Sequence, residues 1–171
     1  MIMLLSKYFT LQELKRTSQR DSAGLIYDNH PPDDVLIMLQ RLVAELDKIR
    51  AFIDLPITIN SGYRSELVNR AVGGAPNSKH KQGLAADIEC YKMSNNLKFL
   101  TAILNTPALN FDKVILECYR PGIADSGWIH FQIAPPSNVS RRLVYSYSNA
   151  SEGFVLLSSN QIKIVREGGV I

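Results

Sequence analysis

The chain of 171 residues has 46% hydrophobic and 20% charged residues, which excludes an intrinsically disordered chain and fits one domain with its own core. Nineteen Lys and Arg against sixteen Asp and Glu give a net charge of +3 without a clustered basic stripe, so we expect no nucleic-acid partner. No apolar run reaches the roughly 18 residues of a membrane-spanning helix, and residues 1–5 are too short an apolar start for a secretory signal, so we expect neither membrane insertion nor a leader.

The first third of the chain is expected to be mainly helical. Thr10 and Glu13 have the spacing of a capping box, which predicts the start of a short helix. Apolar residues recur every three or four positions across 35–53, which predicts a long amphipathic helix. A short β-branched strand at 56–59 and a second helix from Ser65 are expected to follow.

Most of the predicted strands lie in the second half. Apolar and β-branched runs predict them at 84–90, 113–119 and 128–133, and a helix is expected at 95–104. Helices followed by strands with one inserted helix indicate an α+β fold with a small antiparallel sheet and helices packed on one side.

The C-terminal segment is expected to add further strands. Segments 142–147 and 154–157 are candidates for a hairpin, and 161–166 is another candidate strand. We therefore expect a main domain over residues 1–138 and a C-terminal extension over 139–171 that is β and packs on the same domain.

Two of the three histidines and one carboxylate stand out as candidate metal ligands. Asp87 lies within an apolar strand, where its burial carries a desolvation cost unless a cation or several donors compensate. His80 precedes a glycine and small residues that let this strand approach, and His130 shares one face of its strand with Trp128 and Gln132. Two imidazoles and a carboxylate are the ligand mixture of a catalytic zinc with an open fourth position. Taken singly, each residue also fits a structural role: a strand-capping His80, a surface His130, and an Asp87 bound by backbone amides.

Several motifs, in this order, resemble the M15 metallopeptidases, a family that includes zinc D-Ala-D-Ala carboxypeptidases and phage endolysin-type peptidases that cut peptidoglycan. The matching segments are Phe9-Thr10-Leu11-Gln12-Glu13-Leu14, Ser61-Gly62-Tyr63-Arg64-Ser65, Ser78-x-His80-x-x-Gly83-x-Ala85-x-Asp87 and Trp128-Ile129-His130. The resemblance implies a hedgehog/D-Ala-D-Ala peptidase-like fold and one Zn²⁺ ion bound by His80, Asp87 and His130. It also implies that Arg64 orients the substrate or a polarised carbonyl oxygen, and that the substrate is the peptidoglycan stem peptide.

At the position where several relatives carry the general base, this sequence departs from the family pattern. Several relatives carry an acidic residue three positions before the last histidine, where this chain has Gly127. If the turn between the last two main-domain strands centres near 123–124, Glu117 falls opposite His130 and faces the metal water. Glu117 is therefore the expected general base, with Asp125 as the second candidate.

The resulting functional hypothesis is a zinc peptidase acting on peptidoglycan stem peptides, either an endolysin-like endopeptidase or a D,D-carboxypeptidase. With no leader expected, a phage or prophage lysis protein that accumulates in the cytoplasm and then acts on the cell wall fits the sequence. Two alternatives stay open: a non-catalytic, zinc-stabilised phage structural or wall-binding module, suggested by Gly127, and an α+β binding domain without metal. The sequence does not select the bond that is cut or the oligomeric state.

Overall fold

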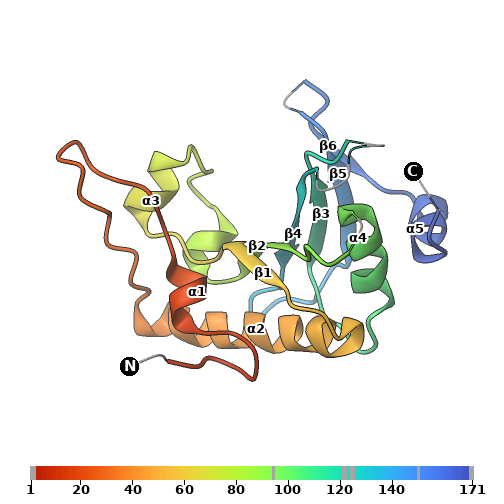
Figure 1. Cartoon of the computed structure of the whole chain (residues 1–171), viewed down its shortest axis with the longest axis horizontal. Coiled ribbons are helices and arrows are strands. Elements are labelled where there is room, and N and C mark those ends of the chain that lie inside the picture. The colour runs from red at the N-terminus through yellow and green to blue at the C-terminus, as the bar shows by residue number, and fades with distance from the viewer. Residues whose placement is uncertain (1–2, 94, 121–122, 124–125, 150, 170–171) are drawn as a thin grey trace.

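The computed structural model describes residues 3–93, 95–120, 123, 126–149 and 151–169. The described residues form a six-stranded sheet with the strand order β1-β2-β4-β3-β5-β6 (Figure 1). Its strands are β1 (Thr58–Ser61), β2 (Ala85–Glu89), β3 (Lys113–Glu117), β4 (Trp128–Gln132), β5 (Leu143–Tyr147) and β6 (Phe154–Leu156). Neighbouring strands are antiparallel except for the parallel pair β3 and β5. The expected α+β class is confirmed, and the sheet is mostly antiparallel.

The helices are short apart from the second one. They are α1 (Leu11–Lys15), α2 (Asp33–Ile53), α3 (Glu66–Ala71), α4 (Asn96–Asn105) and α5 (Ser159–Arg166), with a 3₁₀ helix η1 (Lys79–Gln82) between α3 and β2. Helix α2 runs along the base of the molecule, as Figure 1 shows. Its buried residues include Leu39, Leu42, Leu46 and Ile49, which follow the predicted periodicity.

The two faces of the sheet have different environments. On β4, Ile129 and Phe131 are fully buried in the core cluster that also contains apolar residues of α2 and α4. Trp128, His130 and Gln132 alternate with them and line a cleft on the other face. The predicted alternation of this strand is confirmed, and it separates the core from the candidate site.

The start of α1 is fixed as the sequence predicts. Thr10 Oγ1 accepts a hydrogen bond from the backbone N–H of Glu13 at 3.2 Å, and Glu13 Oε2 accepts one from the Thr10 N–H at 2.8 Å. Leu14 of this helix is fully buried, and its carbonyl accepts a 2.6 Å hydrogen bond from the Tyr63 N–H. Helix α1 therefore holds the loop after β1, which contributes to the site.

The C-terminal segment completes the sheet and adds a helix. Strand β5 lies beside β3, and β6 pairs with β5 as an antiparallel hairpin, as predicted. The strand predicted at 161–166 is wrong, because Ser158 and Gln161 form a capping box that begins α5. Val165 is fully buried, and its carbonyl accepts a hydrogen bond from Thr101 on α4 at 2.9 Å. The division into 1–138 and 139–171 stays a prediction, although both parts contribute strands to one sheet.

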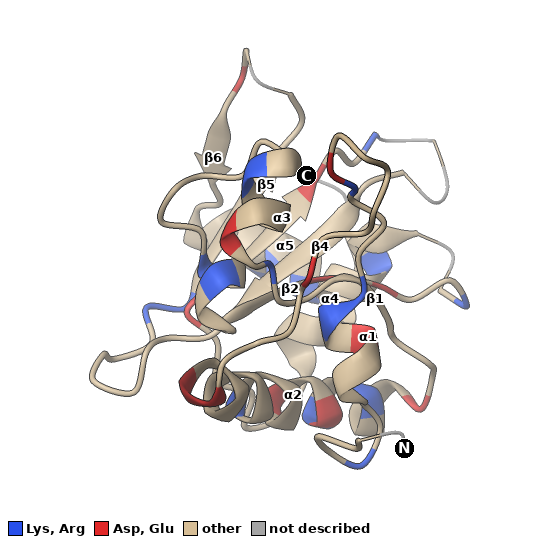
Figure 2. Ribbon diagram, turned by 90° about the vertical axis from the view of Figure 1, so that its left-hand side faces the viewer, with Lys and Arg blue, Asp and Glu red and all other residues tan. Residues whose placement is uncertain are grey.

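Charged residues are spread over the molecule. Figure 2 shows Lys and Arg interspersed with Asp and Glu along the described chain instead of gathered in one stripe. None of the helices in the described segments has the length and hydropathy that a transmembrane span needs.

Candidate metal centre and active site

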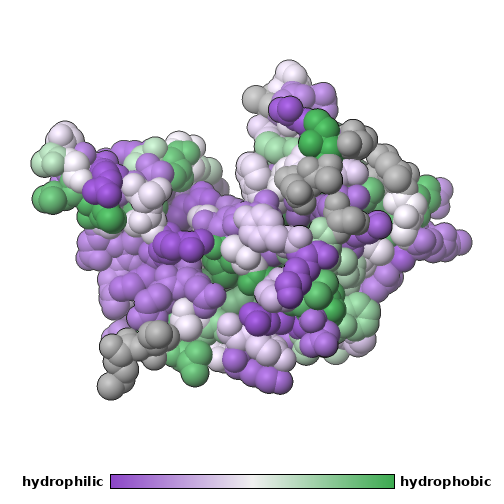
Figure 3. Space-filling view, viewed as in Figure 1, coloured by the Kyte–Doolittle hydropathy of each residue, from purple (hydrophilic) through white to green (hydrophobic). Residues whose placement is uncertain are grey.

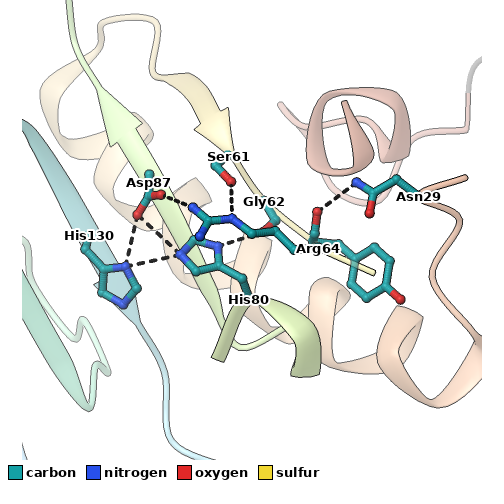
Figure 4. A network of polar contacts seen from close by, with 8 residues as sticks. Asn29, Ser61, Gly62, Arg64, His80, Asp87 and His130 are labelled. Carbon is teal, nitrogen blue, oxygen red and sulfur yellow. Dashed lines mark hydrogen bonds and ion pairs between the residues drawn. The ribbon is translucent and has the colours of Figure 1, made fainter. Parts of the chain in front are cut away.

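His80, Asp87 and His130 meet at one point of the cleft (Figure 4). Asp87 Oδ1 lies 3.0 Å from His130 Nδ1 and 3.3 Å from His80 Nε2. The two imidazole nitrogens are themselves 3.3 Å apart. The structure thus brings together the three predicted ligands, which are separated by up to 50 positions in the chain.

Backbone pairing places two of these side chains beside each other. Asp87 on β2 is directly opposite His130 on the neighbouring antiparallel strand β4. Opposed residues share a face of the sheet, so both side chains point into the cleft. Their proximity depends on strand register, which a shift of one residue would abolish.

The third side chain comes from η1, which ends at a glycine. Gly83 has a φ of +66° and follows the turn that holds His80. A Cβ at this position would lie 2.8 Å from the Val35 carbonyl oxygen of α2. Glycine is therefore required for both its backbone conformation and the close packing of η1 on α2.

A backbone carbonyl fixes the tautomer of His80. The His80 side chain is buried, and its Nδ1 lies 2.7 Å from the Gly62 carbonyl oxygen, which can only accept a hydrogen bond. Nδ1 therefore carries a proton, and Nε2 faces the Asp87 carboxylate. Nε2 and Asp87 Oδ1, 3.3 Å apart, can share a cation, which is either a proton or a metal ion, and the donor set of the site fits a divalent metal.

Arg64 supports the carboxylate instead of standing free in the cleft. Its Nη2 donates to Asp87 Oδ2 at 2.6 Å, and its Nε donates to the Ser61 hydroxyl at 2.8 Å. Asp87 is thereby oriented with Oδ2 on Arg64 and Oδ1 toward the two histidines. Sequence reasoning anticipated an arginine near the cleft and missed Ser61, which pairs with Asp87 across the β1–β2 ladder.

Electrostatics favour an ionised Asp87. Burial alone raises the pKa of this carboxyl, but the charges and hydrogen bonds of His80 and His130 lower it further than burial raises it. The net pKa lies well below the usual range of an aspartate. The group is therefore an anion over the whole physiological pH range, as a metal ligand must be.

Glu117 lines the same cleft, but not where the hairpin argument put it. In the observed register Glu117 pairs with Trp128, and Ile115 is the residue opposite His130. The expected pairing with His130 is therefore wrong by two residues. Because side chains alternate with a period of two, a shift of two residues leaves Glu117 on the cleft face. Burial raises the pKa of Glu117, and the nearby negative charge of Asp87 raises it further.

Gly127 accounts for the missing acidic residue of the family pattern. It has a φ of +73°, and a Cβ there would lie 2.0 Å from the Glu117 carbonyl oxygen. The hairpin therefore admits no side chain at this position. Asp125, the second candidate for the base, lies outside the described residues.

The cleft itself has a volume of about 600 Å³. One side is formed by the turn after α3 and by η1, and the other by β3, β4 and the β5–β6 hairpin; Figure 3 shows the hollow between these two parts. Among its lining residues, sequence reasoning missed Lys79, Lys113, Tyr147 and Phe154. The sequence gives no cue for the last two, because their position depends on which strand β5 joins.

Two comparisons with known proteins identify the family of the chain. A family model described as peptidase M15 matches residues 7–117, a range that includes Arg64, His80, Asp87 and Glu117. The chain is also similar to a zinc D-Ala-D-Ala carboxypeptidase of Streptomyces albus G, with 39% identity over 80 residues. That alignment covers 47% of this chain and 30% of the relative, so the chain matches less than a third of the relative's length.

Proposed function

Because the chain belongs to the peptidase M15 family, we propose that it is a zinc-dependent peptidase that hydrolyses the peptide stem of bacterial peptidoglycan. The observation that carries this proposal is the convergence of His80 Nε2, Asp87 Oδ1 and His130 Nδ1 in the wall of an open cleft. The similarity to the zinc D-Ala-D-Ala carboxypeptidase of Streptomyces albus G supports both the metal and the substrate class.

The three side chains would hold the ion. Two imidazole nitrogens and one carboxylate oxygen are a typical zinc donor set. In the described residues this cluster has no fourth His, Cys, Asp or Glu, a pattern of catalytic sites and not of closed structural ones. When bound, a zinc ion supplies a Lewis acid that acidifies water and polarises a peptide carbonyl.

Glu117 is the proposed general base. Its carboxylate accepts the proton of the attacking water and then delivers it to the nitrogen of the departing amine. Asp87 and Glu117 are the acidic side chains among the described cleft residues, and Asp87 is already committed to the histidines and Arg64. Trp128, the cross-strand partner of Glu117, lines the cleft beside it.

Arg64 acts in this scheme as a positioning residue through Asp87. Its 2.6 Å contact with Oδ2 leaves Oδ1 directed at the histidines. Its direct action on substrate stays a prediction from the family resemblance.

The non-catalytic alternative loses its main argument. It was suggested by Gly127, and the backbone of the hairpin gives a steric reason for that glycine. A carboxylate is present in the cleft from the neighbouring strand β3. Digestion of a defined muropeptide decides whether the protein cuts a D,D bond or the L-Ala-D-Glu bond.

The test is digestion of purified peptidoglycan and of a defined muropeptide by the zinc-loaded protein, followed by mass spectrometry of the fragments. We expect new stem-peptide ends with the wild type and with Glu89→Gln, a control on β2 outside the cleft lining. Glu117→Gln should retain zinc and lose activity by about 10²- to 10⁴-fold. Zinc-loaded wild type that releases no ends from either substrate would reject the proposal in favour of a non-catalytic module.

A further inference from the structure

A row of side chains leads from the candidate base to the C-terminal hairpin. Trp128 on β4 pairs with Glu117 on β3, Glu117 with Tyr147 on β5, and Tyr147 with Phe154 on β6. Paired residues share a face, and all four line the cleft that contains His130. Three aromatic rings thus extend one wall of the cleft away from the metal centre.

The outer two rings stack on each other at a tilt, and the outer one, Phe154, is accessible. The Tyr147 and Phe154 rings are 4.7 Å apart between centroids and inclined by 32°. Phe154 is 61% exposed, which leaves an apolar ring in water at the mouth of the cleft. Both residues lie beyond the segment 7–117 that the family model matches.

We propose that Tyr147 and Phe154 form a saccharide platform that binds a pyranose ring of the peptidoglycan glycan strand. This inference rests on the proposed substrate class. Stem peptides offer methyl, carboxylate, amide and amine groups, none of which needs two aromatic rings to bind it. The flat groups of that polymer with apolar C–H faces are its sugar rings, which pack on aromatic faces while their hydroxyls stay in water.

The separation of the two regions suits one ligand that occupies both. Three strand spacings lie between β4 and β6, about 14 Å in all. An extended peptide of about four residues spans this distance. A sugar on the platform and a stem-peptide bond at His130 can therefore belong to the same molecule.

The test compares binding of a soluble disaccharide-tetrapeptide and of the free tetrapeptide to the zinc-loaded Glu117→Gln protein, in which turnover is suppressed. Calorimetry should show tighter binding of the disaccharide ligand. Adding Phe154→Ala or Tyr147→Ala should weaken that ligand about tenfold and the free peptide by less than about twofold. Val155→Ala is the matched control, because Val155 is an exposed apolar residue of the same strand that does not line the cleft.

Equal affinity of the parent for the two ligands, or an equal loss of both in Phe154→Ala, would overturn the platform. Zinc content and circular dichroism confirm that each variant is folded. Digestion by the wild type is measured separately, so each proposal fails on its own result. If the wild type cuts stem peptides but Phe154→Ala binds the sugar normally, only the platform fails. If binding depends on Phe154 but nothing is cut, only the peptidase proposal fails.

Discussion

Gly62 and His80 are joined by a 2.7 Å hydrogen bond in which a backbone carbonyl holds the Nδ1 proton of a buried imidazole. A Cβ on Gly62 would lie 2.3 Å from the Leu14 carbonyl oxygen, so α1 and the loop after β1 touch at backbone distance here. The N-terminal helix thereby sets the position of a carbonyl that orients a candidate metal ligand.

Gly62→Ala should destabilise the protein and weaken zinc binding together. The added methyl group pushes the loop after β1 away from α1, which lowers the free energy of unfolding by about 3 kcal/mol. The same movement displaces the Gly62 carbonyl that holds His80. Urea unfolding and a zinc competition titration measure the two effects. Gly24→Ala is the control: its φ of +80° brings backbone strain, but no atom lies within 4 Å of the new Cβ. Normal zinc affinity in Gly62→Ala would contradict the role assigned to this contact.

Arg64→Ala should lower zinc affinity by about 10- to 100-fold, because it removes the donor that orients Asp87. Arg70→Ala removes an exposed arginine that pairs with Glu66 on α3 and should leave zinc affinity unchanged. Competition with a chromophoric chelator gives both values. An affinity of Arg64→Ala equal to that of Arg70→Ala would refute the supporting role.

Glu117→Gln should stabilise the metal-free protein at neutral pH while it removes the base. Burial raises the pKa of Glu117 in the folded state, so the folded protein binds this proton more tightly than the unfolded chain does. Glu117 therefore contributes its full stability at pH values below its pKa in the unfolded chain. This contribution is lost as the pH rises through the higher pKa of Glu117 in the folded protein, and it is absent at neutral pH. Urea unfolding of both metal-free proteins as a function of pH checks this: the advantage of Glu117→Gln should grow with pH. A variant less stable than wild type at pH 7 would contradict the expected cost of ionisation.

Asp112 should make the protein sensitive to acid. Its pKa is lowered, chiefly by the hydrogen bonds of Arg141, which donates from Nη2 at 2.6 Å and from Nε at 2.9 Å. Stability from this group is present above the unfolded pKa of about 3.8 and is lost as pH falls through the lower folded value. Asp112→Asn should cost about 2 kcal/mol at pH 7 and less at lower pH. Unfolding curves that differ by the same amount at pH 7 and pH 3 would exclude this linkage.

The candidate ligands were predictable because their signals are local. Strand alternation placed His130 on the face of Trp128, and the glycine after His80 marked the close approach of its turn to a neighbour. The hairpin register was not predictable, because Cys118 and Gly127 both adopt positive φ where β3 and β4 leave the ladder. These two residues shift the pairing so that Glu117 meets Trp128 and not His130.

The C-terminal segment was only partly predictable, for tertiary reasons. In 161–166 the residues Ile162 and Ile164 alternate like a strand, while Ile162 and Val165 have helical spacing. The capping box at Ser158 and the packing of Val165 beside α4 favour the helix. The parallel pairing of β5 with β3, which brings Tyr147 to the cleft, depends on contacts far apart in the chain.

The most direct test of the metal centre is the zinc content of the purified protein after dialysis, measured by mass spectrometry of the metal. We expect one zinc per chain in the wild type and in His30→Ala, whose histidine is exposed and outside the cluster. That zinc should be lost in His80→Ala, Asp87→Ala and His130→Ala. Stoichiometric zinc in those three variants, or none in the wild type after zinc loading, would contradict a metal centre formed by these residues.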